Sequence, residues 1–169
     1  MSNVIAQTQP RTDAWVKHGL VGGVIAGVVF AMFEMIMAAI LNGTAAFFNP
    51  LRMIAGIALG QQALQPGYSL AAVIVVGLIL HMMLSAAFGV VFAGVLRSVP
   101  TLTGSPVRVL VTTSLAGIGL WLVNFYGIAT IAGWPWFPAR SNPIVQLFAH
   151  TIFFGAVLGL YLNATARRD

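Results

Sequence analysis

Four long apolar runs constrain the fold of this chain more than any other feature of its sequence. They cover about residues 19–41, 70–96, 109–131 and 144–162. An α-helix rises ~1.5 Å per residue, so each run is long enough to cross a bilayer core of ~30 Å. Because 59% of the residues are hydrophobic and only 7% are charged, the composition is far from that of a soluble globular domain. We therefore expect an all-α membrane protein built as a bundle of four transmembrane helices.

The segments around these runs predict a single domain. Residues 1–18 form a polar tail, residues 19–166 form the four-helix transmembrane domain, and residues 167–169 form a polar end. The longest connection, residues 42–69, contains an apolar stretch that is too short to span a bilayer. This stretch predicts an interfacial or re-entrant helix between the first and second spans.

The basic residues predict how the bundle is oriented. Four spans place both chain ends on one side of the membrane. Most of the basic residues fall on that side, namely Arg11, Lys17, Arg97, Arg108, Arg167 and Arg168. Only Arg52 and Arg140 fall on the other side, so the positive-inside rule makes both termini cytoplasmic. In size and layout the chain also resembles small four-span bacterial inner-membrane proteins, which implies a multi-pass protein of the inner (plasma) membrane.

Several classes of function are disfavoured by the sequence. The formal net charge is +5, but the basic residues stand singly between apolar runs, so nucleic acid is not an expected partner. The chain has no cysteine, which excludes disulfides, thiolate metal sites and c-type haem attachment. No loop carries a glycine-rich phosphate-binding motif, a serine nucleophile elbow or paired carboxylates. We therefore favour a role that is not enzymatic.

A single acidic residue, Glu34, interrupts the first apolar run. The other acidic residues, Asp13 and Asp169, lie near the chain ends. An ionisable group inside a bilayer costs ~2.5 to 3.5 kcal/mol, so such groups usually face the interior of a bundle and mark a site. Glu34 shares one helical face with small residues, namely Gly23, Gly27, Ala31 and Ala38. This face predicts close contact with another helix.

The other three spans also carry polar residues on faces of small side chains. His81 lies in the second span, Asn124 in the third and His150 in the fourth. We count residues from the cytoplasmic end of each span, at His18, Arg97, Arg108 and Arg167. Glu34, His81 and Asn124 each lie 16 residues from that end, and His150 lies 17 residues from it. These counts correspond to a depth of about 24 to 26 Å. The four side chains are therefore predicted to form one polar layer in the outer half of the membrane.

Three interpretations of this layer stay open. In the first, the polar side chains only form hydrogen bonds between helices, worth ~0.6 kcal/mol each, and Glu34 is protonated or paired to a histidine. In the second, Glu34, His81 and His150 bind a metal ion or relay protons, and Asn124 supplies or orients a ligand. In the third, His81 and His150 are axial ligands of a b-type haem.

The donor set narrows the metals that the second interpretation allows. Imidazole and carboxylate ligands suit divalent metal ions such as zinc, iron, manganese or copper. Four methionines lie near the layer and would favour Cu(I), namely Met32, Met35, Met82 and Met83. Methionine in an apolar helix is more often a packing residue, so Cu(I) is the weaker form of the metal hypothesis.

Two further patterns concern symmetry and partners. Gly27 and Glu34 precede Gly117 and Asn124 by 90 residues, which suggests a two-fold repeat of helix pairs. Besides the lipid bilayer, the expected partners are further copies of this chain or other subunits of a membrane complex. Small-residue faces predict contact surfaces for them at Gly89, Gly94, Gly155 and Gly159. A structural or accessory subunit is therefore the alternative function.

Overall fold

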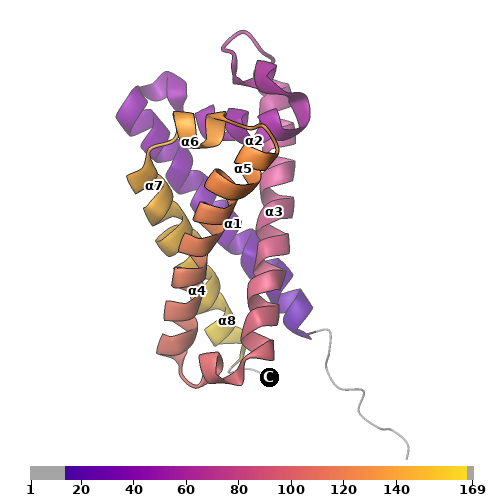
Figure 1. Ribbon diagram of the computed structural model, residues 1–169, viewed down its shortest axis with the longest axis vertical. Helices are drawn as coiled ribbons and strands as arrows, with labels where there is room; N and C mark the ends of the chain where they lie inside the picture. Colours follow the sequence, from indigo (N-terminus) through magenta and orange to yellow (C-terminus); the bar gives the residue numbers. More distant parts are fainter. Residues whose placement is uncertain (1–13, 167–169) are drawn as a thin grey trace, which may run out of the picture.

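The computed structural model describes residues 14–166, and every regular element in this part of the chain is a helix. Four helices are long and apolar enough to cross a membrane, namely Ala14–Asn42, Leu70–Ser98, Pro106–Ile131 and Pro143–Ala166. Figure 1 shows these helices along the length of the molecule, with both ends of the described chain at the bottom. The predicted all-α fold with four helices of this kind is confirmed. Each helix contains one of the four predicted apolar runs.

Two of the long helices are continuous and two are composite. The first is α1 (Ala14–Asn42) and the second is α3 (Leu70–Ser98). The third joins α4 (Pro106–Leu122), the π-helical η4 (Val123–Ile128) and α5 (Ala129–Ile131). The fourth joins α7 (Pro143–Phe148), the π-helical η5 (Ala149–Ala156) and α8 (Val157–Ala166). The shorter helices are η1 (Thr44–Ala46), α2 (Asn49–Leu59), η2 (Gln61–Leu64), η3 (Pro100–Thr103) and α6 (Trp136–Arg140).

The first long helix extends beyond its apolar run. Helix α1 already includes Ala14, so Lys17 and His18 of the predicted polar tail lie on this helix. An apolar run predicts only the part of a helix that lies in apolar surroundings, and the helix itself can continue beyond both ends of the run. The rest of the predicted tail, residues 1–13, and the predicted polar end, residues 167–169, lie outside the described residues.

Local sequence signals define where the later helices begin and end. The Ser69 hydroxyl accepts a hydrogen bond from the backbone N–H of Ala72 and caps α3. Asn142 caps α7 in the same way, and the next residue, Pro143, takes the first helical position, where a missing N–H costs nothing. Helix α2 stops at Gly60, whose φ of 77° is accessible to glycine without strain.

Helices α1 and α3 pack closely through small residues. Gly23 lies against the backbone of Ser85, and Gly89 lies against the backbone of Gly19 and Gly23. A side chain at any of these glycines would overlap backbone atoms of the facing helix. The predicted small-residue face of α3 is buried along its whole length, comprising Gly77, His81, Ser85, Gly89 and Ala93.

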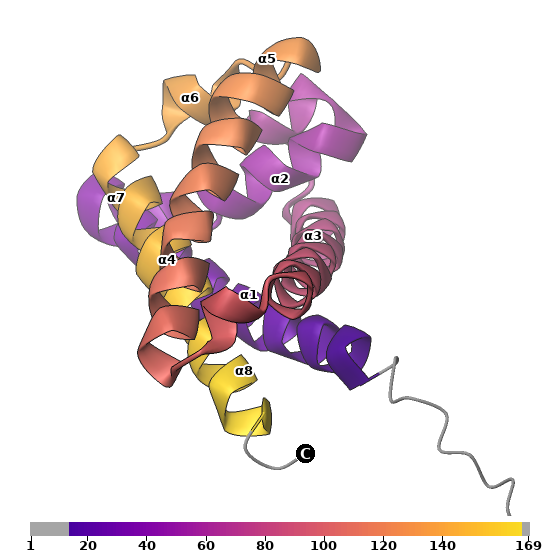
Figure 2. The ribbon, with the colours of Figure 1, turned by 60° about the horizontal axis from the view of Figure 1, so that its bottom comes forward.

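A second close pair joins α4 to the fourth long helix. Gly117 lies against the backbone of His150, and Gly155 lies against the backbone of Thr113. The two pairs meet where α1 contacts α8, with Gly22 against Leu158. In contrast, α3 and α4 make few contacts with each other, and Figure 2 shows them apart over most of their length.

The glycines predicted as contact surfaces for other chains are used inside this one. Gly89 packs against α1, Gly94 packs against the ring of Trp15, and both Gly155 and Gly159 pack against Thr113. The prediction was based on small residues alone. The sequence does not specify whether a face of small residues packs against a helix of the same chain or of another chain. These four glycines therefore give no support to self-association.

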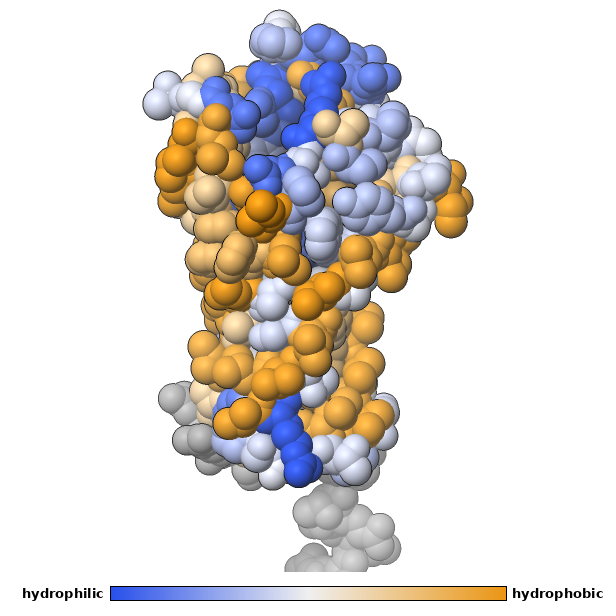
Figure 3. All heavy atoms as spheres, turned by 60° about the vertical axis from the view of Figure 1, so that its left-hand side comes forward, coloured by the Kyte–Doolittle hydropathy of each residue, from blue (hydrophilic) through white to orange (hydrophobic). Residues whose placement is uncertain are grey.

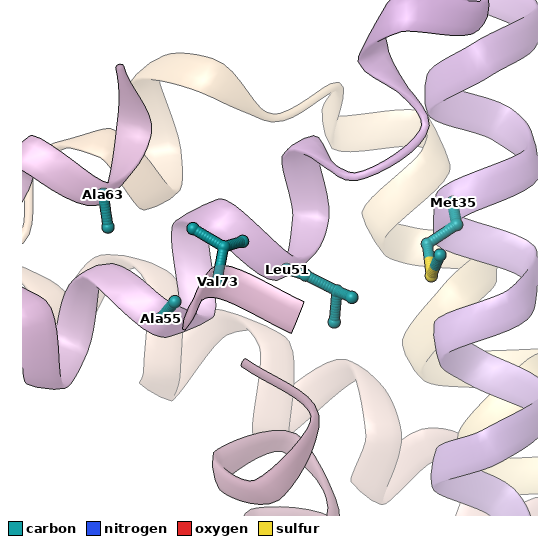
Figure 4. Close-up of a cluster of buried hydrophobic side chains, with 5 residues drawn as sticks. All are labelled: Met35, Leu51, Ala55, Ala63 and Val73. Atoms are coloured by element: carbon teal, nitrogen blue, oxygen red, sulfur yellow. The ribbon is translucent and has the colours of Figure 1, made fainter. Parts of the chain in front are cut away.

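Helix α2 covers the end of the bundle opposite the chain termini. A cluster of five buried side chains attaches it to α1, η2 and α3, comprising Met35, Leu51, Ala55, Ala63 and Val73; Figure 4 shows how they meet. The guanidinium of Arg52 donates hydrogen bonds to the carbonyls of Ala63 and Gln65, at 3.0 and 2.8 Å, and so holds η2 to α2. The Trp136 indole N–H donates to the Met53 carbonyl at 3.0 Å and joins α6 to α2.

The outer surface of the four long helices is apolar. Figure 3 shows one face of the molecule, with a broad hydrophobic region across its middle and hydrophilic residues toward both ends, most of them at the upper end. Large apolar side chains are exposed on every long helix, for example Ile40 at 68%, Val75 at 56%, Leu115 at 61% and Leu160 at 59%. Exposed apolar surface of this kind is typical of a region that contacts a membrane or other proteins.

Candidate functional site

A cavity of about 310 Å³ lies between the long helices. Its walls come from α1, α3, η4 and η5, and residues of α2 and of the segment from Trp134 to Phe137 line its end away from the chain termini. The four polar side chains that the sequence places at one depth, Glu34, His81, Asn124 and His150, all line this cavity. They are therefore brought to one place from four different helices.

Glu34 is buried and is held by one neighbour. The side-chain amide of Gln146 on α7 donates to both carboxyl oxygens of Glu34, at 3.0 and 2.9 Å. Among the described residues, no lysine or arginine forms an ion pair with this carboxyl group. The side-chain amide oxygen of Gln146, Oε1, is also buried and has no hydrogen-bond partner within the described residues.

His81 is buried on α3 and faces α1. Its Nε2 lies 2.9 Å from the carbonyl oxygen of Gly27. A carbonyl oxygen only accepts, so Nε2 must carry the hydrogen of this bond. In a neutral imidazole the other nitrogen, Nδ1, then has a free lone pair. Gly27 is required for this approach, because a methyl group there would lie 2.6 Å from the Cβ atom of Ser85 and 3.7 Å from the imidazole.

His150 on η5 has the opposite ring nitrogen engaged. Its Nδ1 lies 2.9 Å from the carbonyl oxygen of Gln146, one turn earlier on the same helix. The same reasoning places the hydrogen on Nδ1 and leaves the lone pair on Nε2. The ring of Phe30 packs against both imidazoles, with ring centroids 4.8 Å from His150 and 5.4 Å from His81. Phe125 covers another side of His150 at 5.7 Å.

Asn124 differs from the other three polar residues. It is only partly buried, and its side chain forms no hydrogen bond with the rest of the described chain. It lies in η4, whereas His150 lies in η5. Both segments are π-helical, a rare geometry that is often found at functional sites. The two irregular helical segments of the bundle therefore coincide with its polar layer.

The geometry bears differently on the metal and haem interpretations. Within residues 14–166, no group of three or more histidine, aspartate or glutamate side chains is placed to hold a metal ion. Two axial histidines must each place a nitrogen within bonding distance of one iron, with the flat macrocycle between them. In this site the ring of Phe30 contacts both imidazoles. A haem would need this ring to move away.

Sequence reasoning missed two contributors to the site. Gln146 is the direct partner of Glu34, and Phe30 is the ring that both histidines contact. The signal for Gln146 was available, since it is a polar residue one helical turn before His150 in an apolar run. Phe30 gave no signal, because a phenylalanine in an apolar helix is ordinary.

The site combines one carboxyl group, two imidazoles that each keep one free lone pair, and two amides in largely apolar surroundings. Such a set can bind, hold and pass on a proton, or bind a cation next to the carboxylate.

A comparison with protein-family models, with curated proteins and with solved structures gives no match to this chain.

Proposed function

We propose that the chain is a multi-pass protein of the inner (plasma) membrane whose Glu34, His81 and His150 form an intramembrane proton-binding and relay site. The observation that carries this proposal is that these side chains line one cavity although they come from three separate helices. Polar residues that served only as separate contacts between helices would not need to meet. A charged group in an apolar environment is costly, so the carboxyl group of Glu34 is most stable when neutralised by a proton or by a bound cation.

Insertion of the bundle into a membrane is supported by its apolar outer surface. The distribution of charge supports cytoplasmic termini. Lys17, Arg97 and Arg108 lie toward the end that holds the chain termini, whereas Arg52 and Arg140 lie on the connections at the other end. The other basic residues that predict cytoplasmic termini lie outside the described residues, namely Arg11, Arg167 and Arg168.

A reporter fused after Asp169 tests this orientation. A reporter that is active only in the cytoplasm should work there, and it should fail when inserted at Gly67 between η2 and α3. The opposite pattern would overturn the topology.

Proton binding is favoured over metal binding by the hydrogen bonds of the histidines. Each imidazole has one nitrogen engaged by a backbone carbonyl and one free lone pair, so each can accept one proton and return it. A metal site would need three or more ligands around one point, which is not the arrangement in residues 14–166. A divalent metal ion or Cu(I) is therefore the second form of this proposal, and haem b is the third.

The repeat of helix pairs is also part of the proposal. Gly27 contacts His81, and Gly117, 90 residues later, contacts the backbone of His150. The pair of α1 with α3 therefore resembles the pair of α4 with the fourth long helix. Two such pairs around one axis would explain why their polar residues meet at one level. Self-association and membership of a larger membrane complex stay predictions.

The function is tested with purified protein in lipid vesicles that contain a pH-sensitive dye. We expect the wild-type protein to let protons cross under an imposed electrical potential. Glu34→Gln should abolish this flux, because the amide keeps the shape of the side chain without its exchangeable proton. Asp13→Asn is the control, since it removes a carboxylate near the chain terminus. Equal flux in the wild-type protein and Glu34→Gln would refute the proposal.

Elemental analysis and a visible spectrum of the wild-type protein separate the three forms of the site. Stoichiometric metal that is lost in His81→Ala and His150→Ala would replace the proton site by a metal site. A Soret band that is lost in the same variants would replace it by a haem site.

A further inference from the structure

We infer that the cavity beside Glu34 binds a small lipophilic organic cation, which displaces the proton from this carboxyl group. The inference depends on the proposed function, because it takes Glu34 as the group that holds the proton. It adds the chemical class of a substrate. It is derived from the size of the cavity, its aromatic walls, its single acidic group and its incomplete closure.

The cavity has the size of a ligand site and not of a proton path alone. Its volume of about 310 Å³ lies within the range of ~300 to 1,000 Å³ that is typical of small-molecule pockets. A proton relay needs only a file of hydrogen-bonded groups, which occupies far less space. The volume is therefore not explained by proton transfer, and it matches a compact organic molecule.

Aromatic rings form much of the cavity wall. Six of them line it, namely Phe30, Phe88, Phe125, Trp134, Phe137 and Phe154. The faces of aromatic rings carry negative partial charge and attract organic cations, most strongly where water is excluded. The same rings also bind uncharged apolar groups, so the walls alone do not decide the charge of the ligand.

The charge of the ligand follows from the groups around Glu34. The other polar side chains that line the cavity are His81 and Ser85 from α3, His150 from η5, and the amides of Asn124 and Gln146. Arg52 on the neighbouring α2 is engaged with the carbonyls of η2 and does not line the cavity. Within the described chain, no cationic side chain reaches the carboxyl group, so a cationic ligand can fill this role.

Binding of such a cation must release the proton. With the proton bound, Glu34 is neutral and the cavity has no net charge from it. When an organic cation enters, the proton passes to the aqueous phase, and the carboxylate left behind balances the charge of the ligand. One charge replaces one charge, so the apolar surroundings never hold an unbalanced ion, which would be costly.

The cavity is not sealed between α3 and the third long helix. Leu84 on α3 and Ile128 on η4 both line it, and 41% and 46% of their surfaces stay accessible. These two helices make few contacts with each other. In the proposed membrane orientation this side faces lipid, so a lipophilic cation dissolved in the bilayer can enter from the side.

The test uses two probes of the same shape. Benzyltrimethylammonium carries a permanent positive charge, and neopentylbenzene is its uncharged carbon analogue. Binding is followed through tryptophan fluorescence, because Trp134 lines the cavity, and proton release is followed with a pH indicator in weakly buffered detergent solution. We expect benzyltrimethylammonium to bind at least about tenfold more tightly than neopentylbenzene and to release about one proton per cation bound.

Glu34→Gln separates charge recognition from loss of folding. It should lower the affinity for benzyltrimethylammonium at least about tenfold and abolish proton release, while neopentylbenzene should bind as it does to the wild-type protein. Asp13→Asn should leave all three values unchanged. Retained binding of the neutral probe shows that the cavity of the variant is intact.

The remaining outcomes separate this inference from the proposed function. Equal binding of both probes, or cation binding without proton release, would refute the cation inference. If neither probe binds but Glu34-dependent proton flux is present, the inference is wrong and the proton site stands. If the flux is absent as well, both are wrong.

Discussion

Gly27→Ala tests whether the close contact of α1 and α3 positions the site. The added methyl carbon would lie 2.6 Å from the Cβ atom of Ser85, whereas two carbon atoms prefer a separation of ~3.5 to 4.0 Å. The two helices must therefore move apart by about 1 Å. The bond from the His81 Nε2–H to the Gly27 carbonyl, 2.9 Å long, would then exceed the usual limit of ~3.2 Å.

The cost can be worked from these two effects. Overpacking a tight contact costs typically about 1 to 3 kcal/mol, and the lost hydrogen bond adds about 0.5 to 1.5 kcal/mol. Compared with a helical Gly→Ala change that makes no new contact, Gly27→Ala should therefore lower the free energy of unfolding by roughly 1.5 to 4.5 kcal/mol. For a chain of this length, this difference corresponds to a melting temperature that is lower by about 3 to 18 °C.

The assay is thermal unfolding of the purified protein in a mild detergent, followed by tryptophan fluorescence. Gly119→Ala is the matched control, because it makes the same change in a long helix at a position with no atom within 4 Å of the added carbon. Helix propensity favours alanine over glycine by about 1 kcal/mol in both variants, so this contribution cancels. Equal melting temperatures of Gly27→Ala and Gly119→Ala would refute the reasoning.

Three further variants test other contacts of the bundle by the same thermal assay. Gly77→Ala places a carbon 2.7 Å from a backbone carbonyl of α2, so the free energy of unfolding should fall by about 1 to 3 kcal/mol; no change would exclude the tight contact of α2 with α3. Trp136→Phe removes the donor to the Met53 carbonyl and should cost about 0.5 to 1.5 kcal/mol, and a neutral effect would show that this bond does not hold α6. Gln146→Leu removes the hydrogen-bond donor to Glu34 and should cost about 1 to 3 kcal/mol, whereas a more stable variant would contradict the described pairing.

Much of the fold follows from simple geometry. Helical rise relates the length of an apolar run to the thickness of a bilayer, and the four runs indeed lie on four long helices. Helical periodicity also places Glu34 and His81 on faces of small residues, and both side chains are buried on those faces. Counting residues along each helix was sufficient to predict that four polar side chains lie at a similar depth, and all four line one cavity.

Other parts of the site depend on side-chain length and on local helix irregularity. Gln146 lies one turn outward from the predicted layer, yet its long side chain and that of Glu34 reach each other. The π-helical segments η4 and η5 cannot be recognised from apolar periodicity, because one extra residue in a turn changes the pattern only slightly. Gly155 packs against a helix of the same chain and not against another copy. Which helix faces pack together depends on the whole bundle, so the sequence of one helix does not specify it.

The central claim is that Glu34 holds an exchangeable proton in the interior of the bundle. It is tested most directly by infrared difference spectroscopy of the protein in lipid vesicles during a pH titration, since a protonated carboxyl group has a C=O stretch of its own. The chain has only three acidic side chains, so few bands compete. We predict a titrating carboxyl band that is lost in Glu34→Gln and kept in Asp13→Asn. A spectrum in which Glu34→Gln removes no titrating carboxyl band would contradict the account.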